Sequence, residues 1–446
     1  MKKLLVNIAR LLLAAVFIVS GFVKAVDPMG TQYKLEDYAA ALGLSAWLPD
    51  MAAVVMAVAL AAVEFCLGVY MLFAIRRRLT SRLMLLMLCV MTPLTLWLAL
   101  TNPITDCGCF GDAIVLTNWQ TFAKNVVLLV AAVIVVCWPG QMVRFISQSN
   151  QWIVINYTAL FILGIAAWSL YYLPHFDFRP YHIGANIREG MTIPDDAEQP
   201  QFETTFILEK DGQQREFTLD EYPDSTWTFV DSHTVQTRQG YVPPIHDFAI
   251  VTEEGNDITD DVLTDSSYTM LLVAPHLEDA DDAHLDIINE LYEYTRQHGY
   301  PFYCLTASTE RGIDHWRDIT GAEYPFCTTD ETTLKTIVRS NPGLLLLKNG
   351  TVIGKWSHNN LPVIGDDQWQ LPLDRLETGH IPSDSAPAKV LRIILWFVLP
   401  LLLLTIADRL WAWSRWLRRK PRKSQNSQQA QQSQESQQAQ ESQQPQ

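Results

Sequence analysis

Long apolar runs alternate with polar stretches along this chain. Six of the runs approach the length of about 20 residues that a helix needs to cross the hydrocarbon core of a membrane. These runs are Leu4–Val23, Ala52–Ile75, Leu83–Leu100, Phe122–Trp138, Trp152–Leu173 and Val390–Ala407. The fourth is the least apolar, because Lys124 and Asn125 stand in its first turn. We therefore predict six spans, with five as the alternative.

The basic residues of the short loops predict how these spans are oriented, because cytoplasmic loops retain Lys and Arg. Such residues precede the first run, separate the second from the third, and follow the fourth and the sixth: Lys2, Lys3, Arg76, Arg77, Arg78, Arg82, Arg144, Arg415, Arg418, Arg419, Lys420, Arg422 and Lys423. This alternation predicts a multi-pass protein of the bacterial inner membrane with both termini in the cytoplasm. The loops around Lys34–Asp50 and Thr101–Asn118, and the whole stretch Pro174–Ala388, are then outside.

A cleavable signal peptide is the alternative for the first run, with Lys2 and Lys3 as its charged start. However, Arg10 interrupts the apolar region and no small-x-small site follows it. Cleavage would also remove a span that the charge alternation requires, so we predict a retained helix. Arg10 lies near the inner end of this span, where its long side chain can reach the interface.

The segment between the fifth and sixth runs has the composition of a globular domain. Gln201–Ile207 and Glu216–Leu219 flank Asp211-Gly212, which predicts a hairpin, and a second hairpin is predicted around Ser225–Thr237. Farther on, strand-like and helix-like patterns alternate before a closing hairpin turn: Tyr268–Ala274, His284–His298, Pro301–Ala307, Gly312–Thr320, Glu331–Ser340, Gly343–Lys348 and Thr351–Ser357. This alternation predicts an α/β sandwich.

Charge and composition limit the classes of partner that the protein can bind. The net charge of −15 is concentrated in the outside domain, which argues against nucleic-acid binding. The end of the chain, Ser424–Gln446, is almost entirely Gln, Ser, Ala and Glu, and a segment of that composition is predicted to be a disordered cytoplasmic tail. Membrane lipid is the partner that the spans require.

Seven cysteines are present, and five of them have plain structural interpretations. Cys66, Cys89 and Cys137 lie inside spans, where a thiol behaves as a small apolar side chain. Cys304 and Cys327 lie on or near strands of the outside domain. They are either a disulfide across neighbouring strands, which an exported domain permits, or two separate buried thiols, the interpretation that we favour.

The other two cysteines form the sequence Cys107-Gly-Cys109 in an outside loop. A disulfide between them would close a small, strained ring, and strained disulfides are oxidising and exchange easily. A metal site would need further soft ligands, and no second Cys or His pair accompanies the loop. Two roles stay open for this pair: redox chemistry, and a purely structural role in shaping the loop.

Charged residues inside the spans are a second clue. Glu64 falls near the middle of the second run, where an ionised side chain is costly and is usually functional or paired. Lys24 and Lys124 lie near the outer ends of the first and fourth runs. Either Glu64 faces one of these lysines through a polar bundle interior, or it is protonated and bonded to a neighbouring helix.

With these residues in view, Met1–Gly140 resembles the DoxX/MauE group of membrane proteins. The matching features are Ser20-Gly-Phe-Val-Lys24, Glu64-Phe-Cys-Leu-Gly68, Cys107-Gly-Cys-Phe-Gly-Asp112, Asn118-Trp119 and Lys124-Asn125. The resemblance implies a four-helix membrane domain with Cys107, Cys109, Glu64 and Lys24 as candidate catalytic residues, and with Asp112 and Asn125 beside them. MauE-type proteins are associated with maturation of a disulfide-rich periplasmic enzyme, methylamine dehydrogenase. DoxX-type relatives are linked to quinone-coupled oxidation of sulfur compounds or thiols, so a membrane quinone is the implied cofactor.

Residues from Asp247 to Leu376 resemble the thioredoxin-like fold, most closely its TlpA-like periplasmic branch. Asn341-Pro342-Gly343 stands where that family places its cis-proline. Thioredoxins carry Cys-x-x-Cys at a helix start after the first core strand, where the helix lowers the thiol pKa. The matching stretch here, Pro275–Asp281, contains acidic residues and no cysteine. We therefore predict a redox-inactive domain.

The predicted architecture is a membrane helical bundle with an extracytoplasmic α/β thioredoxin-like domain. Residues 1–140 form the four-helix domain, 141–175 contain the fifth span, 176–246 are a linker and β-rich segment, 247–376 are the periplasmic thioredoxin-like domain, 389–408 contain the sixth span and 424–446 are the tail.

The function predicted from these features is membrane thiol–disulfide redox chemistry, as an oxidoreductase coupled to quinone or in the maturation of an exported client protein. The alternative is a non-enzymatic scaffold that uses the thioredoxin-like domain for docking. A transporter is not supported, since there are no inverted repeats or Gly/Pro-broken spans.

Overall fold

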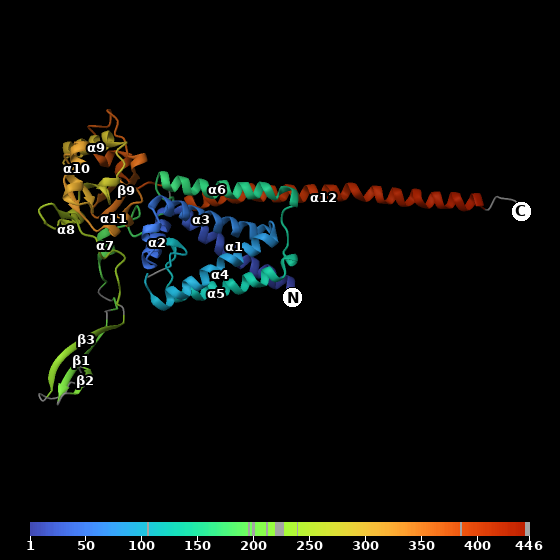
Figure 1. Cartoon of the computed structure of the whole chain (residues 1–446). Coiled ribbons are helices and arrows are strands. Elements are labelled where there is room, and N and C mark those ends of the chain that lie inside the picture. The colour runs from blue at the N-terminus through green and yellow to red at the C-terminus, as the bar shows by residue number, and fades with distance from the viewer. Residues whose placement is uncertain are drawn as a thin grey trace. The chain divides into compact units, whose positions relative to one another are not determined.

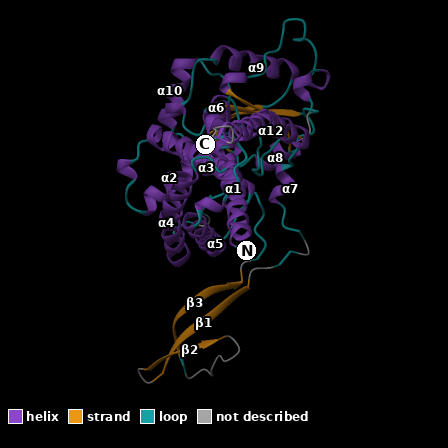
Figure 2. Ribbon diagram, turned by 90° about the vertical axis from the view of Figure 1, so that its right-hand side faces the viewer, coloured by secondary structure: helices purple, strands orange, loops and turns teal. Residues whose placement is uncertain are grey.

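The computed structural model describes residues 1–104, 107–194, 197–198, 201–210, 213–218, 227–238, 240–383 and 386–441. The chain divides into two compact units, one formed by Met1–Phe176 with Ser383–Gln446 and the other by Asp177–Pro382. Long helices make up the first unit (Figure 1), and the described strands all belong to the second (Figure 2). The predicted turn Asp211-Gly212 lies outside the described residues.

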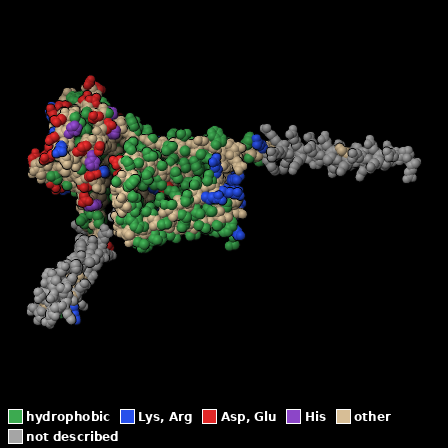
Figure 3. All heavy atoms as spheres, viewed as in Figure 1, with side chains coloured by type: hydrophobic (Ala, Val, Ile, Leu, Met, Phe, Trp, Pro, Cys, Tyr) green, Lys and Arg blue, Asp and Glu red, His purple; other side chains and the backbone are tan. Residues whose placement is uncertain are grey.

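The first unit is a helical bundle with an apolar exterior. Among the described residues, six helices are long and apolar enough to cross a membrane. They are α1 (Lys2–Val26), α3 (Asp50–Phe73), α4 (Arg77–Thr101), α5 (Asn118–Cys137), α6 (Gln151–Tyr171) and α12 (Ala386–Glu441). Figure 3 shows apolar side chains over the visible face of this bundle and Lys and Arg gathered at one end. The prediction of six spans is confirmed, and the chain is a membrane protein.

Two glycines allow α1 and α3 to meet backbone to backbone. A Cβ on Gly21 would lie 2.3 Å from the Phe65 nitrogen, and a Cβ on Gly68 would lie 2.7 Å from the Ile18 nitrogen. Small residues at a contact let membrane helices approach closely, and dispersion forces then hold them together. This contact fixes how α1 and α3 are rotated toward each other.

A short helix, α2 (Pro28–Ala41), follows α1 where the sequence analysis placed part of a loop. Asp27 caps it by accepting a hydrogen bond from the Gly30 nitrogen at 2.9 Å, and Pro28 occupies the first helical position, which suits its fixed φ. The expectation of a loop from Lys34 is therefore wrong as far as Ala41.

Arg10 connects α1 to the segment between α5 and α6. Its side chain is buried, and Nη1 donates to the Val143 carbonyl of that segment at 2.6 Å.

The last helix is joined to the start of α6 through one buried carboxylate. Asp408 of α12 accepts hydrogen bonds from the Ser147 nitrogen at 2.8 Å, Ser147 Oγ at 2.6 Å and Asn150 Nδ2 at 2.7 Å. The described helix α12 continues to Glu441, whereas the sequence analysis expected a disordered tail from Ser424. Gln, Ala and Glu are good helix formers, and residues 442–446 lie outside the described part.

The second unit is built around a six-stranded sheet of order β4-β7-β6-β5-β8-β9. Strands β5, β6 and β7 are parallel, whereas β4, β8 and β9 pair antiparallel to their neighbours. The strands are β4 (Val251–Thr252), β5 (Tyr268–Val273), β6 (Phe302–Thr306), β7 (Phe326–Thr328), β8 (Gly343–Lys348) and β9 (Thr351–Ser357). The helices are α7 (Ile187–Met191), α8 (Thr259–Thr264), α9 (Leu285–His298), α10 (Glu310–Thr320) and α11 (Glu331–Ile337).

This order, with parallel central strands and an antiparallel hairpin at one side, is a thioredoxin-like arrangement. The Asn341–Pro342 bond before β8 is cis, which confirms the cis-proline prediction for Pro342. The alternating strands and helices predicted from Tyr268 to Ser357 are confirmed. Strands β4 and β7 were not predicted, because each is only two or three residues long.

The alternative of a Cys304–Cys327 disulfide is wrong. In the β6–β7 register Cys304 lies opposite Phe326, and Leu305 lies opposite Cys327. Successive side chains of a strand point to opposite faces, so the two sulfurs are separated by the sheet. Both are buried free thiols, as the favoured interpretation expected.

A separate three-stranded sheet has the order β2-β1-β3 (Figure 2). Pairing of β1 (Gln201–Lys210) with β2 (Gln213–Thr218) confirms the first predicted hairpin. The second predicted hairpin is wrong, because β3 (Thr228–Arg238) is one continuous strand that pairs with β1. Its sequence contains no Gly, Pro or Asn to turn the chain.

The α1–α3 contact gives a first prediction. Gly21→Ala forces the two backbones apart, and overpacking of this kind costs about 1–3 kcal/mol. We expect a lower midpoint of thermal unfolding in detergent. Gly164→Ala in α6 is the matched control, because an added Cβ there meets nothing within 4 Å. Equal midpoints for the two variants would contradict the close contact.

Candidate functional site

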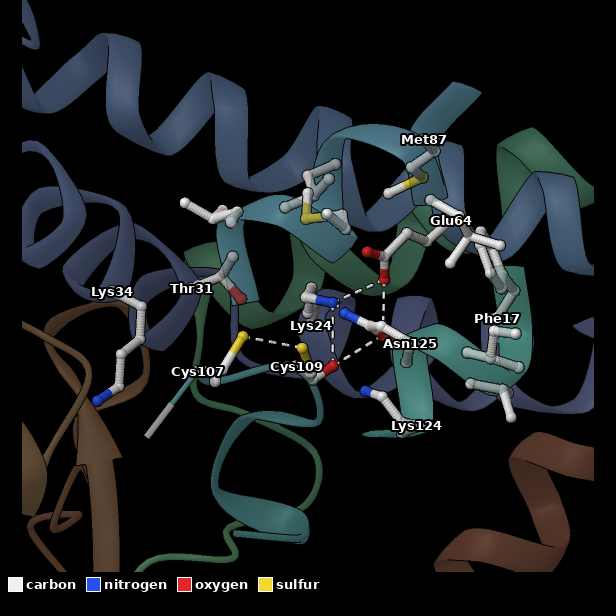
Figure 4. A pocket seen from close by; sticks show the side chains of 18 of the residues that line it. Phe17, Lys24, Thr31, Lys34, Glu64, Met87, Cys107, Cys109, Lys124 and Asn125 are labelled. Atoms are coloured by element: carbon white, nitrogen blue, oxygen red, sulfur yellow. Dashed lines mark hydrogen bonds and ion pairs between the residues drawn. The ribbon is translucent and has the colours of Figure 1, made fainter. Parts of the chain in front are cut away.

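A cavity of about 120 Å³ lies inside the helical unit, between α1, α2, α3, α4, α5 and the loop that carries Cys107 and Cys109 (Figure 4). Most of its wall is apolar, from side chains that include Phe17, Leu60, Met87, Leu88, Met91 and Leu128. Polar groups join this wall from α1, α2, α3, α5 and the cysteine loop: Ser20, Lys24, Thr31, Lys34, Tyr38, Glu64, Cys107, Cys109, Lys124 and Asn125. The cavity therefore combines a mainly apolar surface with polar side chains from five elements, and its volume lies below the range of about 300–1,000 Å³ that is usual for small-molecule sites.

Lys24 and Glu64 form an ion pair at this cavity. Lys24 Nζ lies 2.7 Å from Glu64 Oε2, and both side chains are buried. Ser20, one turn before Lys24, accepts a hydrogen bond from Lys24 Nζ at 2.8 Å and lies 2.7 Å from Glu64 Oε2. Of the interpretations left open for Glu64, the structure shows the one in which it faces Lys24.

The cysteine loop is held against this pair through its backbone. The Cys109 carbonyl lies 3.0 Å from Lys24 Nζ and 2.7 Å from Ser20 Oγ, and the Cys107 carbonyl accepts from the Tyr38 hydroxyl at 2.8 Å. Gly108 between them has φ of +62°, and a Cβ there would lie 3.0 Å from Lys34 Cγ. Only glycine adopts this conformation readily.

The two thiols are neighbours with opposite acidities. Their sulfurs are 3.0 Å apart. The hydrogen bond from Cys107, assisted by the Lys124 and Lys24 charges, lowers the pKa of Cys109 to about 6. Donating that bond, together with burial, raises the pKa of Cys107 above its ordinary range. Either sulfur could donate in this contact, and the lysine charges beside Cys109 favour Cys109 as the thiolate and Cys107 as the donor.

Two residues of α5 complete the polar part of the cavity. Lys124 Nζ lies 4.4 Å from the centre of the Phe110 ring, in a cation–π contact. Asn125 Nδ2 donates to Thr95 Oγ1 of α4 at 3.2 Å. Asp112, by contrast, lies in the short turn Gly111–Ala113 and is not among the residues of the cavity wall.

The sequence analysis missed the contribution of α2. Thr31, Lys34, Leu35 and Tyr38 all line the cavity, and their spacing of i, i+3, i+4 and i+7 is that of one helix face. This spacing, with the Asp27-Pro28 start signal, was available in the sequence. Ser20 was noted only as part of a motif, without a role.

The second unit contributes no cysteine at the position where thioredoxins carry theirs. Pro275–Asp281 contains the short turn Leu277–Asp279, and Glu278 there accepts from Ser308 Oγ at 2.7 Å. His276 lies 3.0 Å from Glu331. In the described part of the chain, no three His, Cys, Asp or Glu side chains are arranged to hold a metal ion.

Comparison with known proteins agrees with the helical part. Residues 2–138 match the family model described as methylamine utilisation protein MauE, and residues 202–239 match a domain of unknown function, DUF8463. No curated protein matches the chain.

Among solved structures, a chain from Bacteroides thetaiotaomicron, described as a candidate protein disulfide isomerase, is similar at 13% identity, with a TM-score of 0.22. The match covers 26% of this chain and 77% of that one. Its score is too low to support an argument, so the thioredoxin-like assignment rests on strand order and on Pro342.

The ion pair gives a second prediction. Lys24→Met leaves the Glu64 carboxylate buried without its cation, and breaking a buried pair in this way costs about 3–5 kcal/mol. We expect the double variant Lys24→Met/Glu64→Met to lower the free energy of unfolding by less than the sum of the losses in the two single variants. The measurement is a double-mutant cycle of unfolding free energies in detergent. Additive effects would mean that the two side chains do not interact.

The thiol pair gives a third prediction. With the pair reduced, the rate of Cys109 alkylation should rise with pH through about 6, the pKa of its thiol, and then level off because the thiolate is the reactive form. Cys107 should remain unreactive over the same range. Lys124→Met should move the Cys109 midpoint to higher pH, since a favourable charge is lost, while Lys34→Met serves as the matched control. An ordinary thiol midpoint of about 8.5 in the unaltered protein would contradict the assignment.

Proposed function

We propose that this membrane protein, MauE-type over residues 2–138, is a thiol–disulfide oxidoreductase at the outer face of the bacterial inner membrane. Cys107 and Cys109 cycle between a dithiol and a disulfide by exchange with an exported client protein. The observation that carries the proposal is the thiol pair, 3.0 Å apart, set against a buried ion pair at the wall of an apolar cavity.

The distribution of basic residues supports the orientation. Lys and Arg gather at one end of the bundle in Figure 3, and retention of such residues favours the cytoplasm for that end. Counting spans from Lys2 puts the cysteine loop between α4 and α5 outside, with the chain between α6 and α12 on the same side and both termini in the cytoplasm.

The groups around the sulfurs support redox chemistry. The charges of Lys24 and Lys124 stabilise a thiolate on Cys109, and a thiolate is the form that exchanges with disulfides. Glu64 and Ser20 form a chain of polar groups from the loop into the bundle, suited to moving the protons that thiol oxidation releases.

The cavity supports a lipid-soluble quinone as the electron partner of the pair. Its apolar wall suits a ring, and the Lys124 ammonium and Asn125 amide are donors suited to the ring's carbonyl oxygens. When bound, a quinone would take up two electrons and two protons. Closure of the disulfide from a Cys107 thiol and a Cys109 thiolate supplies the two electrons and one proton, and the second proton would come from the surrounding water.

The thioredoxin-like unit, in this proposal, docks the client. It has no thiol pair of its own, and Cys304 and Cys327 are buried on opposite faces of a sheet. These features exclude it as a relay for electrons and leave it a binding role.

A non-enzymatic scaffold is the second candidate, and one observation favours it. The usual second redox pair of a relay is missing from the second unit, as its free cysteines are both buried. In that case the Cys107–Cys109 pair shapes the loop and the whole chain assists assembly of an exported protein.

The decisive test is a titration of intact membranes with glutathione buffers and with a quinone analogue, followed by alkylation and mass spectrometry of Cys107 and Cys109. We expect reversible titration and a response to quinone. Cys107→Ser should abolish client oxidation or reduction entirely, because one sulfur cannot form the internal disulfide. Cys137→Ser, at an exposed thiol at the end of α5, is the control and should have no effect. If Cys107 and Cys109 keep one redox state throughout the titration, the oxidoreductase proposal is wrong and the scaffold is favoured.

A further inference from the structure

The surroundings of the two sulfurs differ enough to assign them different parts in exchange. This inference rests on the proposed function and deepens it. We infer that client thiols bond to Cys107, while Cys109 is the sulfur that leaves and stays inside the protein.

Position distinguishes the two sulfurs first. Figure 4 shows Cys109 on the side of Lys24 and Lys124, and Cys107 on the side of Thr31 and Lys34 of α2. Both cysteines are half-buried, so the charged groups beside each sulfur, and not its exposure, distinguish them.

Backbone anchoring distinguishes them next. The Cys109 carbonyl accepts from Lys24 Nζ of α1, which also forms the ion pair with Glu64 of α3. The Ser20 hydroxyl lies within hydrogen-bond distance of both this carbonyl and Glu64, and its one hydrogen goes to one of them. The Cys107 carbonyl is held by Tyr38 of the short helix α2. Cys109 is thus tied to the close α1–α3 contact, whereas Cys107 is tied to the element that covers the loop.

The charges act in the same direction. Exchange is faster when the departing sulfur is the more stable thiolate. Negative charge on the Cys109 sulfur is stabilised by Lys124 and Lys24, and the Cys107 thiol donates its hydrogen to it in the reduced state. A nucleophile that attacks Cys107 expels the Cys109 thiolate, which both lysines stabilise. Attack at Cys109 would expel the Cys107 thiolate, on which Lys124 and the Tyr38 hydroxyl act but Lys24 does not.

The step balances as follows. A client thiolate forms a bond to the Cys107 sulfur, the Cys107–Cys109 bond breaks, and Cys109 leaves with the electron pair as a thiolate. A second client thiol, having lost its proton, attacks the client sulfur of the mixed disulfide. Cys107 then leaves and takes up a proton. The client is oxidised by two electrons, the protein holds a Cys107 thiol and a Cys109 thiolate, and the lipid-soluble quinone reoxidises this pair.

The experiment uses the full chain in lipid nanodiscs with its pair oxidised. Reduced glutathione is the probe, because a monothiol cannot complete the second step within the mixed disulfide. After a short reaction, acid quenching and alkylation, peptide mass spectrometry locates glutathione and the alkyl group. We expect glutathione on Cys107 and the alkyl group on Cys109, with an excess of about tenfold over the reverse arrangement.

Variants of Lys124 test whether stabilisation of the leaving thiolate, and not the exposure of a sulfur, decides which sulfur is attacked. Lys124→Met should slow formation of the Cys107 adduct and reduce the excess, because the leaving thiolate loses a stabilising charge, and Lys124→Arg should restore both. Glutathione mainly on Cys109, or equally on both, overturns the assignment while leaving the oxidoreductase intact. If neither sulfur accepts glutathione and the pair never opens, the proposed function itself fails.

Discussion

The ion pair between Lys24 and Glu64 is the constraint on which the arrangement of the helical unit depends. Charges inside a membrane bundle are stable only when each is paired and its remaining hydrogen-bonding groups are satisfied. Here the pairing requires α1 and α3 to meet at a fixed rotation, which the glycine contacts at Gly21 and Gly68 provide. Through Ser20 and the Cys109 carbonyl, the same pair then fixes the cysteine loop. Helix packing, charge and thiol geometry are therefore one connected system.

The thioredoxin-like fold and the paired thiols lie in different units of the molecule. The thioredoxin-like unit has the strand order and cis-proline of a redox fold, but acidic residues stand where its cysteines would be. The paired thiols are instead in the helical unit, where lysines inside the spans supply the positive field that a helix N-terminus supplies in thioredoxins. The thioredoxin-like strand order and the adjacent thiol pair therefore belong to different units of the chain.

Much of the architecture could be predicted from the sequence because it follows from one-dimensional patterns. Apolar run length gives the spans, and alternation of strand and helix patterns from Tyr268 gives the α/β unit. Glu64 and Lys24 could be singled out because charge in a span is costly. Their pairing could not, since Lys24 and Lys124 are both near the outer ends of spans and only the rotation of the helices selects between them.

The errors share a cause, which is that three-dimensional contacts decide among locally similar options. Helix α2 has only a weak apolar pattern, and its face is defined by the cavity that it covers. A Cys304–Cys327 disulfide does not form because the two cysteines are offset by one residue in the β6–β7 register and so point to opposite faces of the sheet. Neither of these outcomes is encoded by local spacing alone.

All the hydrogen-bond donors of the Lys24 ammonium group are already used within the protein. An ammonium carries three N–H donors, and Lys24 directs them to Ser20 Oγ, Glu64 Oε2 and the Cys109 carbonyl. No hydrogen remains for a molecule entering the cavity unless one of these bonds breaks. Among the described residues, none accepts a hydrogen bond from Lys124, whose contact is with the Phe110 ring. Lys24 would therefore act on a ligand in the cavity only through its charge, whereas Lys124 still has N–H groups to donate to one.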